Sequence, residues 1–261
     1  MVVKLSAADS NRMNVAINQM DSEVFDGCVL DLADFDPTAD FAAFEAGYLA
    51  RHSPIYISCK VPVEDLESVH QLEAAGFRFV EFQMRFRASL GRSFDVSAHD
   101  YRYELVTSPE ILERVLEIAG ATFEHDRITR DPYIKQLNRP DLSGERYRRF
   151  VSQSFQRPDE CVYALISNPT GQVVGFGTHR ITGPDSALLL ISGVAPELKS
   201  SGLGALLDQF AWNELKRKGI KYFFGHASGA NYPIINLVMR GMGFRFVQGF
   251  VVLRKVYGYE R

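Results

Sequence analysis

The chain has 261 residues, 46% of them hydrophobic, and its 29 basic and 32 acidic residues give a net charge of -3. This length favours two domains or one duplicated unit, and the charge balance provides no basic field for nucleic acid or an anionic membrane. No apolar run has the length of a signal peptide or a membrane-spanning helix. We therefore expect a cytoplasmic protein with a small-molecule partner.

The first third of the chain alternates short strands with amphipathic helices. A strand is expected at residues 29–32, and residues 33–52 carry aromatic side chains at helical spacing. The stretch "PIYIS" is the next strand. It precedes a helix over residues 63–76, whose expected buried face consists of Leu66, Val69 and Leu72. The strand "GFRFVEFQMRFR" ends this unit.

Residues 90–101 lack periodicity and form a predicted linker, which separates a first domain at 1–92 from a second at 101–261. Ser108 is a suitable N-cap for a helix that Pro109 begins, and a second helix is expected over residues 142–155. Three strands separated by turn sequences follow, and then helix, strand, helix and strand. This order predicts an α+β fold with a mixed, mostly antiparallel sheet.

The pentapeptide "GFRFV" occurs twice, at residues 76–80 and 243–247. The strand candidates "PIYIS" and "KYFFG" stand at the same distance before the two copies, with a helix between in each case. Both copies thus have the order strand, helix, Gly-Phe, strand. Duplication of one supersecondary unit explains this order better than a chance match.

Cysteines and histidines indicate neither disulfides nor a metal site. The three cysteines are odd in number, far apart and placed in apolar runs, which is typical of reduced core thiols. The six histidines never occur at a metal-ligand spacing such as H-E-x-x-H, and G-x-S-x-G is absent. The sequence therefore gives little support to metal-dependent or serine-hydrolase chemistry.

One loop between a strand and a long helix is suited to an anion. Its residues are Lys199, Ser200, Ser201, Gly202, Leu203 and Gly204. Consecutive backbone N–H groups at a helix N-terminus favour phosphate or pyrophosphate. Leu207 stands where a dinucleotide-binding G-x-G-x-x-G would need its third glycine, and the P-loop order is absent. The alternative is a helix start whose small residues serve close packing.

The stretch Val194-Ala195-Pro196, followed by this loop, resembles motif A of the GCN5-related N-acetyltransferases, V-x-P and then [QR]-x-x-G-x-[GA]. Lys199 replaces the usual Gln or Arg at the same spacing. Downstream, "NYPIINLVMRGMGF" resembles motif B, with Asn231 near the helix start. The resemblance covers about residues 160–255. It implies the fold of that family and acetyl-CoA, or another short acyl-CoA, as co-substrate held by the loop and Asn231.

The resemblance also implies a mechanism. A bulged strand splays from its neighbour, and the backbone groups of Ser192 and Val194 bind the pantetheine arm and polarise the thioester carbonyl, which a neutral amine attacks. The family's acidic Tyr falls at Val238 or Met239, and neither can donate a proton. Either the thiolate leaves without an acid or another residue serves. His226 is the candidate base or acid; the alternative is a hydrogen-bonding role at a strand end.

The whole chain resembles nucleotide-linked amino-sugar N-acyltransferases of the dTDP-fucosamine acetyltransferase type, in which an incomplete acetyltransferase-like unit precedes the catalytic one. The matching pieces are "DSEVF" at residues 21–25, the degenerate first repeat and "FEHDRITRDPYI". The implied acceptor residues are Arg127, Arg130, Asp131 and Tyr133. Arginine suits a diphosphate, aspartate a hydroxyl or ammonium, and tyrosine a stacked base; a solvated loop with local ion pairs is the alternative.

The expected activity is acyl transfer from acyl-CoA to the amine of a nucleotide-linked 3-amino or 4-amino dideoxy sugar. Two alternatives stay open: acetylation of a peptide, polyamine or antibiotic amine, and a non-catalytic acyl-CoA-binding module. A homodimer is also left open. Only the second copy is expected to bind the cofactor, because Asp34, Asp36 and Asp40 occupy the corresponding loop of the first and would repel pyrophosphate.

Overall fold

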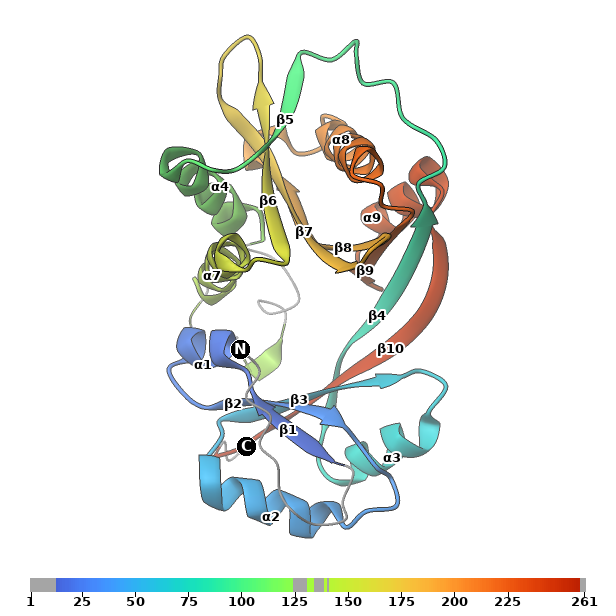
Figure 1. The fold of residues 1–261 in the computed structure, drawn as a ribbon. Coiled ribbons are helices and arrows are strands. Elements are labelled where there is room, and N and C mark those ends of the chain that lie inside the picture. Colours follow the sequence, from blue (N-terminus) through green and yellow to red (C-terminus); the bar gives the residue numbers. More distant parts are fainter. Residues whose placement is uncertain (1–12, 124–130, 134–138, 140, 259–261) are drawn as a thin grey trace.

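All strands of the described residues join one sheet, in the order β1-β2-β3-β10-β4-β9-β8-β7-β6-β5 (Figure 1). The computed structural model describes residues 13–123, 131–133, 139 and 141–258. The strands are β1 Asn14–Ile17, β2 Val29–Asp34, β3 Tyr56–Pro62, β4 Arg78–Ser89, β5 Tyr101–Leu105, β6 Glu160–Ser167, β7 Val173–Gly183, β8 Ser186–Val194, β9 Tyr222–Ser228 and β10 Arg245–Val256. The predicted α+β fold with a mixed, mostly antiparallel sheet is confirmed.

The helices lie on the faces of this sheet. They are α1 Gln19–Phe25, α2 Phe41–His52, α3 Leu66–Ala74, α4 Pro109–Thr122, α7 Leu142–Gln156, α8 Leu203–Arg217 and α9 Tyr232–Asn236, with the 3₁₀ turn η1 Pro196–Leu198 and the π-helical turn η2 Leu237–Met242. Within the described residues, no helix combines the length and apolar character needed to cross a membrane.

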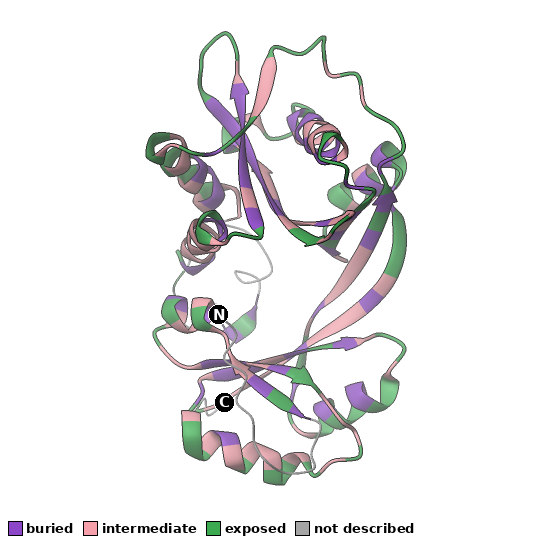
Figure 2. Cartoon of the chain, viewed as in Figure 1, coloured by how far each residue is buried: buried purple, intermediate pink, exposed green. Residues whose placement is uncertain are grey.

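In the second half of the chain, residues 101–258, both faces of β6 and β7 are covered. Helices α4 and α7 pack on one face and α8 on the other (Figure 1), so nearly every residue of these two strands is buried or half-buried (Figure 2). Helix α4 begins as expected, because Ser108 Oγ accepts a hydrogen bond from the Ile111 backbone N–H at 3.3 Å. Val115 and Ile118 then face the core.

In the first half, residues 13–89, α2 and α3 pack against β1, β2 and β3. Asp40 caps α2 by accepting a hydrogen bond from Ala43 N–H at 3.1 Å. Val69 and Leu72 of α3 are buried as predicted. Leu66 is not: it is 57% exposed. It is the first residue of α3, where the chain has only just turned toward the core.

The two "GFRFV" strands pair with each other. Strands β4 and β10 run antiparallel along their whole length, as a long arm between the two halves (Figure 1). Arg245 pairs with Arg87, and Arg254 pairs with Arg78. Arg78 and Arg245 are counterparts in the repeat, as are Arg87 and Arg254. If each residue is replaced by its counterpart, the pair Arg245–Arg87 becomes the pair Arg78–Arg254. The two copies are therefore related by an approximate two-fold axis.

The irregularities of this arm obey the same symmetry. The register shifts between Phe246 and Gln248, and again where Val252 pairs with Glu81 and Leu253 with Phe79. The skipped residues are Val247 and Val80, each the final residue of its pentapeptide. An equivalent bulge in each copy gives both strands the same local twist, which supports the duplication inferred from the sequence.

The last strand of each half also pairs with strands of the other half. Strand β10 lies between β3 and β4, and β4 lies between β10 and β9. The stretch of β4 that pairs with β9 corresponds in the repeat to the stretch of β10 that pairs with β3. The sheet therefore continues across the predicted boundary at residues 93–100, and the division into domains at 1–92 and 101–261 stays a proposal.

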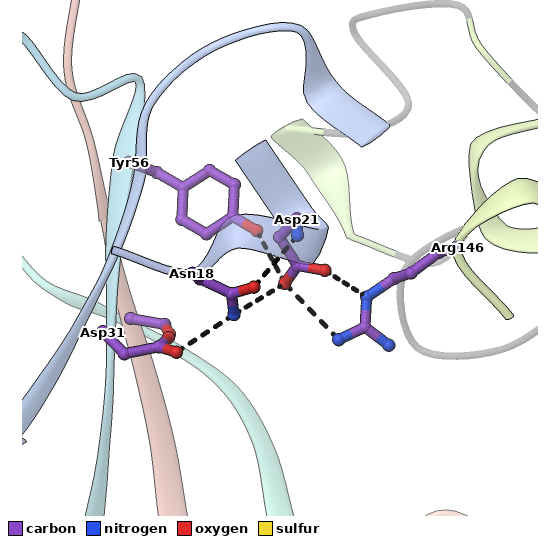
Figure 3. A network of polar contacts seen from close by, with 6 residues as sticks. Asn18, Asp21, Asp31, Tyr56 and Arg146 are labelled. Atoms are coloured by element: carbon purple, nitrogen blue, oxygen red, sulfur yellow. Dashed lines mark hydrogen bonds and ion pairs between the residues drawn. The ribbon is translucent and has the colours of Figure 1, made fainter. Parts of the chain in front are cut away.

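A buried ion pair also joins the halves. Arg146 of α7 donates to Asp21 of α1, with 2.7 Å between Arg146 Nε and Asp21 Oδ1, and both side chains are almost entirely buried. Tyr56 and Asn18 donate to the same carboxylate, and Asn18 also reaches Asp31 (Figure 3). Because Arg146 balances the charge of Asp21 and each member has hydrogen-bond partners, the network holds α1 against α7.

Candidate active site

Strands β8 and β9 separate partway along their length. They pair in parallel from Ser186 with Tyr222 to Leu188 with Phe224, but β8 continues to Val194 and β9 to Ser228. Just past the last pair, β8 bulges: Thr178 of β7 pairs with Ile191, whereas the next residue, His179, pairs with Leu189. The bulge turns β8 away from β9. The bulge and the splay implied by the sequence resemblance are both present.

The backbone of β8 turns alternate peptide groups toward this opening. Ala195 N–H donates to Val174 O of β7 at 2.9 Å. In an antiparallel ladder every second residue has both of its groups directed away from the partner strand. Ser192 and Val194 are these residues, so their peptide groups face the side that β9 has left. Thr122 Oγ1 of α4 donates to Val194 O at 2.9 Å and fixes the strand end.

The glycine loop joins the end of β8 to α8. Gly202 is the N-cap of α8, with φ +84°, and it supplies no side-chain acceptor to the first turn. A Cβ atom on Gly202 or Gly204 would meet only open space. Ser201 Oγ donates to Leu198 O at 2.7 Å, while Lys199 and Ser200 are exposed. The loop thus offers a helix N-terminus and room for an anion, so a pyrophosphate fits.

His226 lies on β9 two residues beyond its last pair with β8. Partial burial, together with the positive charges of Lys60 and Arg85, lowers the pKa of His226 to about 4. The imidazole is therefore neutral at physiological pH, and the residue is exposed. A neutral imidazole at the mouth of the opening can accept a proton.

An acidic residue that the sequence analysis did not select lies under the same strand. Asp208, on the second turn of α8, is 9% exposed. Desolvation raises its pKa to about 7, and a hydrogen bond from Ser192 partly offsets this. The signal in the sequence was an aspartate on the apolar stripe of "LGALLDQFAW", where helical spacing requires a core residue.

Two further buried polar side chains, whose rings are 6.4 Å apart, have no hydrogen-bond partners among the described residues. These are Tyr103, through its hydroxyl, and His179, through both ring nitrogens. A Cβ atom on Gly177, which pairs with Ser192, would be 2.7 Å from Tyr103 Oη. Burial lowers the pKa of His179 to about 3, so its ring is neutral. The core beneath β8 is unusually polar.

Comparison with solved structures finds this architecture elsewhere. A GCN5-related N-acetyltransferase from Kribbella flavida is 16% identical, with 97% of this chain and 89% of that chain covered at a TM-score of 0.64. A tandem GNAT protein from the clavulanic acid biosynthesis pathway is 16% identical, with 95% and 79% covered at 0.62. A GCN5-related glucosamine N-acetyltransferase region of a fungal β-N-acetylglucosaminidase is 13% identical, with 93% and 31% covered at 0.60.

The chain has the fold of the GCN5-related N-acetyltransferases. Searches with protein-family models and with curated protein sequences find no match. At such low identity the structural likeness establishes the acetyltransferase fold, and the site residues within it stay predictions.

In this acetyltransferase fold the segment after β9 departs from a regular helix. Asn231 is exposed and caps α9, accepting a hydrogen bond from Ile234 N–H at 3.4 Å. After one turn the helix widens into η2, where Val238 is buried and Met239 is exposed. Neither side chain can donate a proton. The structure therefore assigns no general acid to this position.

Two of the four predicted acceptor residues lie among the described residues, and one of them, Tyr133, contacts the first half of the acetyltransferase fold. Asp131 forms a buried ion pair with Arg254 of β10 and accepts a hydrogen bond from Tyr133 N–H at 2.9 Å. The Tyr133 ring is buried 6.2 Å from that of Tyr56, with Arg254 above it. These contacts give the pair a structural role, while their acceptor role stays a prediction. Arg127 and Arg130 lie outside the described residues.

The corresponding region of the first half has no comparable opening among its described residues. Strands β2 and β3 pair in parallel from Val29 with Tyr56 to Leu32 with Cys59, and β2 ends two residues later, at Asp34. Asp40, rather than a glycine, caps the following helix. The shorter strand and the acidic cap both disfavour binding of a pantetheine arm and pyrophosphate there.

Proposed function

We propose that the protein is an acyl-CoA-dependent N-acyltransferase whose site lies in the second half. The proposal rests on one observation: β8 and β9 separate beside peptide groups of β8 that face the opening, and β8 leads directly into a glycine loop at a helix N-terminus. This is the geometry that an extended thioester with a pyrophosphate at its other end requires.

In this proposal the first turn of α8 and the loop Lys199–Gly204 bind the pyrophosphate. The peptide groups of Ser192 and Val194 hold the pantetheine arm and polarise the thioester carbonyl. Acyl-CoA supplies the acyl group in activated form. Neutral His226 accepts the proton that the attacking amine gives up, and the thiolate, a weak base, leaves without a side-chain acid.

The acceptor we propose is the amine of a nucleotide-linked amino-dideoxy sugar. The support is the resemblance of the whole-chain plan to enzymes of that kind, with an incomplete unit before the catalytic one. A fold neighbour described as a glucosamine N-acetyltransferase region gives a precedent for an amino sugar on this fold.

The activity is tested by following thiol release from acetyl-CoA in the presence of dTDP-linked amino sugars, peptides and polyamines. We expect turnover with an amino sugar. Turnover confined to peptides or polyamines would contradict the acceptor class, and tight CoA binding without turnover of any amine would indicate a non-catalytic binding module.

The loop is tested with Gly202→Glu, which adds a negative charge and a side chain where the pyrophosphate is proposed to lie. We expect the Kd for CoA to rise at least about tenfold, since the carboxylate would compete for the helix N-terminus. Gly171→Glu is the matched control: Gly171 also has a positive φ and open space but lies in the turn between β6 and β7. An equal effect of both variants would contradict the loop assignment.

A further inference from the structure

Side chains from three strands meet on one face of the sheet beside the opening. Arg85 of β4 pairs in register with His226 of β9, so both point to the same face. Lys60 of β3 extends across β10, with its Nζ 4.2 Å from the centre of the Phe250 ring, and donates to Gln83 of β4. The rings of Phe250 and His226 are 6.5 Å apart. Residues of both halves therefore surround His226.

The guanidinium of Arg85 lies over the Phe224 ring, 5.0 Å from the ring centre. Arg85 Nε is buried and has no hydrogen-bond partner in the part of the chain that the structure describes. Among the described residues, no carboxylate lies within ion-pairing distance of it. A buried guanidinium N–H costs free energy when it has no acceptor. A bound acceptor atom would satisfy it.

Two other arginines with largely buried side chains are paired with carboxylates. Arg146 pairs with Asp21, and Arg254, farther along β10 on the same face as Lys60, pairs with Asp131. Lys60 and Arg85 both add positive charge near His226, while the buried carboxylate of Glu81 lies opposite Lys60 across β10. Burial lowers the pKa of His226, and the charges of Lys60 and Arg85 lower it further.

The location connects this positive group to the opening. His226 is on the first stretch of β9 that β8 has left, and Arg85 is its direct neighbour. An amine placed to attack a thioester held along β8 would have the rest of its molecule beside these side chains.

We propose that Lys60, Arg85 and His226 form a subsite for a phosphate or pyrophosphate group of the acyl acceptor. This inference rests on the proposed function and deepens it, because the first half of the chain would then supply two of the three residues that select the acceptor. Arginine binds phosphate oxygens in a bidentate manner, lysine adds a second charge, and a neutral imidazole adds one N–H donor.

The subsite is tested by titrating inorganic pyrophosphate and dTDP into the full-length protein saturated with CoA, so that the loop is already filled. Arg85→Met keeps the length of the side chain over Phe224 but removes the charge. We expect it to raise the Kd of both probes at least about tenfold. Lys60→Met should act in the same direction. Lys221→Met, at the opposite end of β9 with a side chain 72% exposed, is the control and should leave both Kd values unchanged.

A second readout separates binding from folding. Bound phosphate offsets the charges of Lys60 and Arg85, so the imidazole pKa of His226, followed by NMR, should rise by about one pH unit when pyrophosphate is added. In Arg85→Met it should already be higher without pyrophosphate and should respond less. Equal Kd values in wild type and Arg85→Met, or a His226 pKa indifferent to pyrophosphate, would overturn the subsite.

These results are independent of turnover. If pyrophosphate binding depends on Arg85 but no amine is acetylated, the subsite holds and the proposed function fails. If amines are acetylated while Arg85→Met changes neither the binding of the probes nor the KM of any phosphorylated acceptor, the function holds and the subsite fails.

Discussion

The pKa of Asp208 is set by the buried environment of its side chain. It occupies a core position of α8, with Ser192 as its hydrogen-bonding neighbour. Tyr103 of β5 and His179 of β7 belong to the same buried polar group, and neither carries a charge at neutral pH. Burial therefore favours the protonated carboxyl, and the ionised form is costly.

We predict that Asp208→Asn removes a pH dependence of stability. The pKa of Asp208 is raised to about 7 from an unfolded value near 3.9. The folded state therefore binds the proton more tightly, so stability falls as pH rises from about 4 to about 7. In urea unfolding experiments from pH 4 to pH 8, the free energy of unfolding of the variant should increase relative to that of wild type across this window, by a few kcal/mol at most.

Comparing the two proteins at each pH cancels the contributions of His226 and His179, whose lowered pKa values act in the opposite direction and destabilise the fold as pH falls below about 6.5. A stability difference that stays constant with pH would contradict the assignment of Asp208.

At the scale of single residues, the sequence predicted only the part of the candidate site that is formed by consecutive residues. The loop from Lys199 to Gly204 was found because consecutive small residues at a helix start predict an anion site by themselves. The role proposed for Arg85 depends on strand register, which pairs it with His226. The role proposed for Lys60 depends on the strand order, which lets its side chain extend over β10 toward β4. Periodicity indicates which face a side chain occupies but not which distant strand lies next to it.

Among the elements, α4 and α7 approach closely at a pair of glycines. A Cβ atom on Gly144 of α7 would lie 2.8 Å from Gly120 O of α4. A backbone carbonyl cannot move aside as a flexible side chain can. The contact therefore sets the distance between the two helices.

We predict that Gly144→Ala destabilises the protein by about 1–3 kcal/mol, because overpacking outweighs the gain in helix propensity. Gly47→Ala is the matched control in α2, since its new Cβ would meet only the end of the Arg51 side chain at 3.7 Å. It should stabilise by about 0.5–1 kcal/mol. Chemical unfolding measures both, and effects of the same sign would contradict the packing argument.

Element prediction succeeded where periodicity and caps coincide. Ser108 and Pro109 marked the start of α4, and Gly76, with φ +93°, follows the end of α3. The prediction that Leu66 is buried was wrong, because an apolar residue in the first turn of a helix need not reach the core. The π-helical turn after Asn236 was not predicted, since no residue type marks such a turn reliably.

At the scale of the whole molecule, the two halves complete each other. Without β10 the first half has a gap between β3 and β4, and without β4 the second half has a gap between β9 and β10. The unpaired backbone groups on both sides of each gap would be exposed. The linker was recognised in the sequence, but the exchange was not, because duplicated strands can pair within or between copies.

We predict that fragments 1–95 and 96–261 do not fold alone as stable monomers but form a 1:1 complex when co-expressed. Size-exclusion chromatography and the cooperativity of thermal unfolding measure this. Two separately stable monomers with sharp transitions would contradict the mutual completion of the halves and favour independent domains.

The position of β10 also orders events during synthesis. The ribosome makes β3 and β4 long before residues 245–256 exist, so the two strands cannot reach their final neighbours until translation is almost complete. Pairings of such large sequence separation fold slowly and leave strand edges open for the intervening time. The nascent first half must therefore wait, and a premature stop near the end of the message would damage the beginning of the protein as much as its end.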